Sequence, residues 1–92
     1  MELSEFLESL KRLSQVECLK MIHYKCLELF HGKSIEQLKD FIKYFHQEGE
    51  VNNLKMILIA TQSFKEHELL KDIISETQRL FDQNMKKYAD QS

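Results

Sequence analysis

Proline and tryptophan are absent from this chain of 92 residues, and glycine occurs only twice. A phosphate-cradling loop needs several neighbouring glycines, and Gly32 and Gly49 are too far apart to form one. Without proline, the strongest internal helix breaker is missing, so helices must end at other residues. Each glycine is soon followed by Ser or Asn, which commonly begin helices. Gly32 and Gly49 are therefore predicted to end one helix before the next begins.

The sequence also lacks a surplus of either charge, because 13 Lys and Arg stand against 15 Asp and Glu. General polyanion binders usually carry a basic excess. The longest unbroken apolar run covers only Met56 to Ala60, whereas about 20 residues are needed to cross a bilayer. The acidic start, Met1 to Glu5, differs from the basic, then apolar start of a secretory signal. We therefore expect a cytoplasmic protein.

Cysteine is scarce as well, with only Cys18 and Cys26. In a helix their separation corresponds to about 12 Å along the axis, whereas a disulfide requires Cα atoms within about 7 Å. We expect two reduced thiols, with Cys26 acting as a small buried hydrophobic residue.

What the sequence does contain is a globular composition, with 42% hydrophobic and 30% charged residues. This balance excludes a disordered chain, and the length suggests a single domain covering 1–92. Apolar residues recur at helical spacing along most of the chain. We predict an all-α fold, a small antiparallel bundle of three to four helices covering about 4–31, 35–48, 53–62 and 64–88.

The first predicted helix contains an ambiguous point. The apolar phase drifts near residue 14, where Ser14 and Glu17 match a capping box, the pattern that often begins a helix. Either one bent helix continues through this point or two helices meet there. We favour one helix because neither glycine nor proline enforces a break.

Capping-box matches also precede the second and fourth predicted helices. Ser34 to Gln37 follows Gly32, and an apolar stripe begins at Ile35. Ser63 to Glu66 precedes the long pattern that we expect to form the fourth helix.

The third predicted helix, capped by Asn52 or Asn53, is apolar almost all round. At about 100° per residue, the side chains from Leu54 to Ala60 point in nearly every direction, with Lys55 and Gln62 as the polar strip. Such a helix must be buried in the core or at an interface. A buried β-strand is the local alternative, which we disfavour because no second strand is available for pairing.

These patterns favour a non-catalytic regulatory or adaptor protein that binds another protein through an apolar helical surface, as a homodimer. The alternative is that the same residues are simply core. No cofactor, metal or catalytic residue is predicted. The candidate contact residues are Tyr44, Leu54, Met56, Ile57 and Ile59.

Two other functions remain open from the sequence. A nucleic-acid-associated regulator would need its lysines to converge on one face, and the relevant residues are Lys33, Lys39, Lys43 and Lys55. A histidine phosphotransfer or metal-binding bundle would use His31 or His67. His67-Glu68 begins like a zinc-protease helix, but Lys71 stands where the second histidine belongs.

Overall fold

The computed structural model describes the backbone of residues 3–91 and the side chains of residues 3–89. Within this part of the chain the protein is all-helical, as predicted, but it has five α-helices rather than three or four. None of the described helices is both long enough and apolar enough to cross a membrane. The elements are α1 (Leu3–Leu10), α2 (Gln15–His31), α3 (Ile35–Glu48), α4 (Val51–Thr61), the 3-10 turn η1 (Gln62–Phe64) and α5 (Lys71–Gln91).

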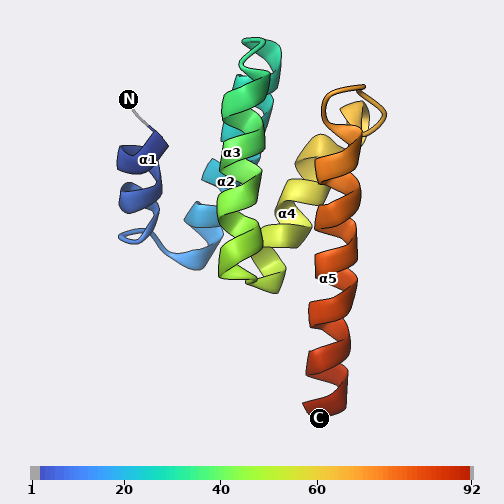
Figure 1. The fold of residues 1–92 in the computed structure, drawn as a ribbon. Coiled ribbons are helices and arrows are strands. Elements are labelled where there is room, and N and C mark those ends of the chain that lie inside the picture. Colours follow the sequence, from blue (N-terminus) through green and yellow to red (C-terminus); the bar gives the residue numbers. More distant parts are fainter. Residues whose placement is uncertain (1–2, 92) are drawn as a thin grey trace.

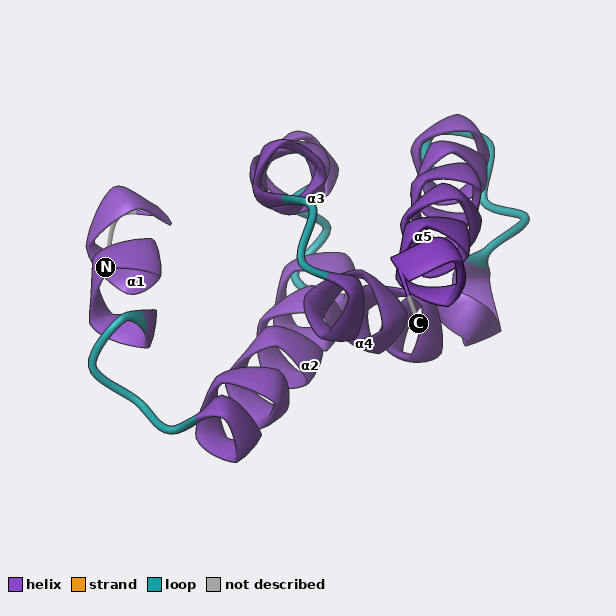
Figure 2. Ribbon diagram, turned by 90° about the horizontal axis from the view of Figure 1, so that it is seen from below, coloured by secondary structure: helices purple, strands orange, loops and turns teal. Residues whose placement is uncertain are grey.

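The helices α2 to α5 run alternately up and down, and α1 stands beside them (Figure 1). Seen from below, α2 and α4 lie in one layer, while α3 and α5 lie in the other (Figure 2). The smallest dimension of the fold is 19 Å, which fits two layers of helices whose axes are about 10 Å apart.

Helix α4 occupies the centre and packs against α2, α3 and α5. This agrees with its largely apolar sequence, in which Asn52 and Lys55 are exposed. It begins at Val51, two residues before the predicted start. The cap is Glu50 rather than an asparagine, because the Glu50 carboxylate accepts the backbone N–H of Asn53 at 3.2 Å. A carboxylate at this end also suits the helix dipole.

The prediction of one helix over 4–31 is wrong, because the helix is interrupted between Leu10 and Gln15. Ser14 adopts an extended conformation, and its Oγ accepts the backbone N–H of Glu17 at 3.3 Å. The break turns α1 back so that Phe6 meets Phe41 of α3 edge-on, with ring centroids 5.8 Å apart. The capping box and this burial together outweigh the absence of a helix breaker.

Helix α3 has the predicted bounds, and the glycines end α2 and α3 as predicted. Gly49 does so in the left-handed region, at φ 69°, which favours glycine. Gly32 keeps φ −78°, and the following Lys33 takes the left-handed conformation at φ 61°. Ser34 precedes α3 as predicted, although its side chain makes no capping hydrogen bond.

The fourth predicted helix, 64–88, is also corrected, because α5 begins only at Lys71. Phe64 and Leu70 are both buried, yet on a continuous helix they would point about 120° apart. The irregular stretch 65–70 lets both be buried: Phe64 stacks in parallel on Phe30, with centroids 3.8 Å apart, while Leu70 enters the core. The capping-box match at Ser63 therefore does not begin a helix.

The core lies between the two layers. Two polar contacts hold α5 against the α3 side: His46 Nε2 lies 2.7 Å from Thr77 Oγ1, and Asn84 Nδ2 donates to the carbonyl of Gly49 at 2.9 Å. The fully buried hydrophobic side chains, each with no exposed area, are Ile22, Cys26, Leu38, Phe41, Ile42, Leu54, Ile57 and Leu70.

A pair of leucine truncations tests the central position of α4. Leu54→Ala removes a fully buried side chain and should lower the free energy of unfolding by about 2–5 kcal/mol. Leu69→Ala, at a position 57% exposed, should cost less than about 1 kcal/mol. Urea denaturation of both variants provides the measurement, and equal losses would contradict this placement of α4.

Candidate protein-binding surface

The structure separates the five predicted contact residues into a buried and an accessible set. Leu54 and Ile57 are fully buried, so packing accounts for both. Tyr44 and Met56 are partly buried and touch the core. Ile59 is 48% exposed, because it lies about 200° around the helix from Ile57. Of the five, Ile59 is therefore the most accessible to a partner.

Ile59 borders a groove between α4 and α5, which we call the α4–α5 groove. Its cavity has a volume of about 290 Å³. Its apolar residues lie along α4 and at the start of α5. Its polar residues include Lys55 and Lys65, and Gln78 lies on the α5 side. The lining residues are Lys55, Leu58, Ile59, Gln62, Lys65, Ile74 and Gln78.

Tyr44 lies elsewhere, at a second cavity of about 250 Å³ whose lining includes Leu7 and Leu10 of α1. Burial raises the pKa of the Tyr44 phenol, and a hydrogen bond to Glu48 raises it further. The phenol therefore stays protonated at neutral pH. Tyr44 and Ile59 thus border different cavities, and the sequence prediction had placed both on one contact surface.

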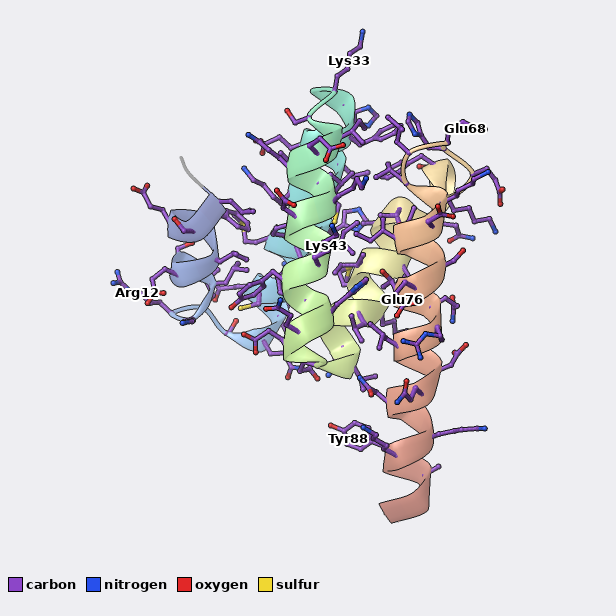
Figure 3. The ribbon with its side chains drawn as sticks, in the orientation of Figure 1. Arg12, Lys33, Lys43, Glu68, Glu76 and Tyr88 are labelled. Carbon is purple, nitrogen blue, oxygen red and sulfur yellow. The ribbon has the colours of Figure 1, made fainter. Side chains whose placement is uncertain are left out.

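The C-terminal part of α5 extends beyond the ends of α3 and α4 (Figure 1). Met85 and Tyr88 are exposed on this part. Figure 3 shows Tyr88 projecting from the lower end of α5, where it lines a cavity of about 390 Å³ together with Glu48, Gly49 and Asn84. The projecting end therefore adds apolar surface close to the turn between α3 and α4.

The buried thiol and hydroxyl groups have structural explanations. Burial raises the pKa of the Cys26 thiol to about 12, so the reactive thiolate does not form at neutral pH. The hydroxyls of Thr61 and Thr77 donate to the carbonyls of Ile57 and Ile73, at 2.8 and 2.7 Å. Both cysteines are free thiols, in agreement with the sequence prediction.

Two of the four histidines meet at one end of the bundle. The rings of His31 and His67 both stand edge-on to Phe30, with centroids 5.6 and 5.7 Å from it. The sequence alone does not connect these two histidines, because they lie 36 positions apart and no local pattern joins them. Among the described residues, no group of three or more His, Cys, Asp or Glu could hold a metal ion.

The four lysines required for nucleic-acid binding lie on three elements. Lys33 belongs to the turn between α2 and α3, and Lys39 and Lys43 lie on α3. Lys39 forms an ion pair with Glu36 at 3.8 Å, and Lys55 lines the α4–α5 groove. Nucleic-acid binding stays a prediction from the sequence, and we do not propose it.

Comparison of the chain with protein-family models, with curated proteins and with solved structures found no match. Function must therefore be inferred from the chain's own residues.

His46 is half-buried, and the polar contact that it makes with Thr77 depends on its tautomer. Because the Thr77 hydroxyl already donates to Ile73, His46 Nε2 must be the donor between them. Burial lowers the pKa of His46 below its ordinary 6.5, and Arg79 and Lys43 lower it further, whereas Glu76 opposes them. The folded state therefore favours the neutral imidazole.

This shift predicts that stability falls in mild acid. The unfolded chain binds a proton at His46 at higher pH than the folded chain does, so the free energy of unfolding should decrease as pH falls below about 6.5 and level off below the folded-state pKa. His46→Gln replaces the imidazole N–H with an amide N–H that does not titrate. This variant should flatten the dependence of stability on pH. The measurement is chemical denaturation between about pH 5 and 8.

The matched control for that experiment is His23→Gln, a substitution of another partly buried histidine on a different helix. If His23→Gln flattened the pH dependence and His46→Gln did not, the assignment to the His46–Thr77 contact would be wrong.

Proposed function

We propose that this chain is a non-catalytic regulatory or adaptor protein that works by protein–protein binding, as a homodimer joined through the α4–α5 groove. The observation that supports it most directly is the exposure of Ile59 on a helix that is apolar almost all round. The helices α2, α3 and α5 pack against the other sides of α4, and Ile59 shares the open side with the exposed polar residues Asn52 and Lys55. The exposed side of α4 is apolar at Ile59 and Leu58, and a partner would remove this surface from water.

A second copy of the chain suits the groove, because the lysines of one copy could pair with an acidic residue on α5 of the other. Lys55 of α4 and Lys65 of the stretch before α5 line the groove. Asp82 does not line the groove but lies one turn further along α5, where it accepts a hydrogen bond from the groove residue Gln78 at 3.0 Å. A two-fold axis that pairs α4 of one copy with α5 of the other would bring the lysines of each copy toward Asp82 of its partner. The apolar centre, Ile59 and Ile74, would then be covered.

The exposed area of the chain also supports a pairing role. The surface measures 6257 Å², whereas a compact monomer of this mass exposes roughly 5,600 Å². The projecting end of α5 contributes to the difference (Figure 1). Stable interfaces bury about 800 Å² on each partner, so a specific dimer would have to cover surface beyond the groove itself.

The proposal predicts the effect of a charge at the groove. The wild-type chain should sediment as a dimer at micromolar concentration, and Ile59→Asp should sediment as a monomer because its carboxylate would be desolvated at the interface. The thermal midpoint of the dissociated Ile59→Asp chain should match that of the wild type diluted to monomer, since Ile59 is half exposed within one chain. Sedimentation equilibrium and circular dichroism provide the two measurements.

Val16→Asp is the matched control, because Val16 is an exposed β-branched residue on α2 and does not line the groove. It should remain dimeric. A wild-type chain that stays monomeric throughout the micromolar range, or an Ile59→Asp variant that stays dimeric, would overturn the proposal.

A further inference from the structure

A cavity of about 500 Å³ opens at the end of the bundle where α2 turns into α3. We call it the turn cavity. The end of α2, the turn and the start of α3 form one side of it, and the irregular stretch before α5 forms the other. The lining residues are Phe30, His31, Lys33, Ile35, His67 and Leu69.

The cavity has an apolar wall and a basic rim. Phe30, Ile35 and Leu69 form the wall, and Leu69 is 57% exposed. The rim consists of His31, Lys33 and His67, all nitrogen-bearing side chains. This is the composition of a small-molecule site, in which a mostly apolar surface carries a few polar groups that fix the orientation of the ligand.

The hydrogen bonds of the rim leave donors available. His67 Nδ1 accepts the backbone N–H of Leu69 at 3.2 Å, so in the neutral ring the proton lies on Nε2. Nε2 is then a donor for a ligand. Lys33 is exposed, and Figure 3 shows its side chain extending outward from the turn, while Glu68 lies on the stretch before α5.

The nearby acids are paired with lysines outside the cavity or do not line it. Glu28 pairs with Lys25 at 3.3 Å, and Glu36 pairs with Lys39 at 3.8 Å. Glu66 and Glu68 flank His67 in the sequence and are exposed, but no carboxylate is among the residues that line the cavity. The cavity itself therefore presents cationic and donor groups to a ligand.

Lys33 lies at the cavity in a left-handed backbone conformation. Lys33 adopts φ 61°, a conformation that favours glycine, although a glycine stands immediately before it with φ −78°. This conformation ends α2, because the Lys33 N–H donates to the Phe30 carbonyl at 3.0 Å and the Ser34 N–H donates to the Leu29 carbonyl at 2.9 Å.

We propose that the turn cavity binds a small amphipathic carboxylate. The carboxylate lies against His31, Lys33 and His67, which supply charge-assisted hydrogen bonds. The apolar body lies on Phe30, Ile35 and Leu69. The turn cavity shares no lining residue with the α4–α5 groove, so this proposal stands independently of dimer formation.

The test is a titration with 1-naphthoate, followed by amide chemical shifts of the full chain. Shifts should be confined to the turn, residues 30–35, and to residues 67–69. The neutral analogue 1-naphthalenemethanol, which keeps the apolar body and lacks the charge, should bind about tenfold more weakly, the effect of losing one charge-assisted hydrogen bond.

Three variants separate the cavity from general attraction between charges. Lys33→Gln should weaken naphthoate binding about tenfold, whereas Lys20→Gln, which removes an exposed lysine of α2 outside the cavity, should leave it unchanged. Lys33→Gly should weaken binding as Lys33→Gln does, yet raise the thermal midpoint because glycine relieves the left-handed conformation.

Several results would overturn the proposal. They are equal weakening by Lys33→Gln and Lys20→Gln, shifts that map to the α4–α5 groove, equal binding of the neutral analogue, and no binding at millimolar naphthoate. A Lys33→Gly variant that is stabilised and still binds at full affinity would also do so, because the strained lysine would then have no role in the cavity.

Discussion

The arrangement of this protein depends on the burial of α4. A helix with apolar side chains in almost every direction gains free energy only if neighbours cover it on several sides, at about 25 cal/mol for each Å² of apolar surface removed from water. The fold supplies α2 on one side, α5 on the other and α3 across the layer. Leu54 and Ile57 are fully buried as a result. Ala60 is also buried, and its small side chain allows a neighbouring helix to pack closely.

Apolar burial alone does not determine how the surrounding helices align along α4. Hydrogen bonds are directional, so the few polar contacts in the interior specify the alignment. His46, near the end of α3, meets Thr77 of α5, and Asn84 reaches the carbonyl of Gly49. Gly49 therefore both ends α3 and accepts the hydrogen bond that attaches the turn to α5.

The same dependence on neighbours explains which features the sequence could predict. The start and end of α3 follow from local signals, a serine before the helix and a glycine after it, so its bounds were predicted correctly. The start of α5 was predicted wrongly because it depends on Phe64 reaching Phe30, a contact between residues distant in the sequence. The break before α2 was misjudged because Ser14 and the burial of Phe6 act together.

The candidate sites show the limit more clearly. In a helix that is apolar almost all round, the sequence pattern does not distinguish Ile57, which is fully buried, from Ile59, which is half exposed. That difference arises only from where α2, α3 and α5 lie. The turn cavity was not predicted at all, because His31 and His67 come together only through the folding of the stretch before α5.

That stretch, residues 62–70, connects the two candidate sites. Gln62 and Lys65 face the α4–α5 groove, while His67 and Leu69 face the turn cavity. An irregular segment is usually the more mobile part of a fold. Here Phe64 and Leu70 are both buried in the core, so the exposed residues between them are held on a fixed frame. Because binding sites need supported side chains, the break that delays α5 is also what makes both surfaces possible.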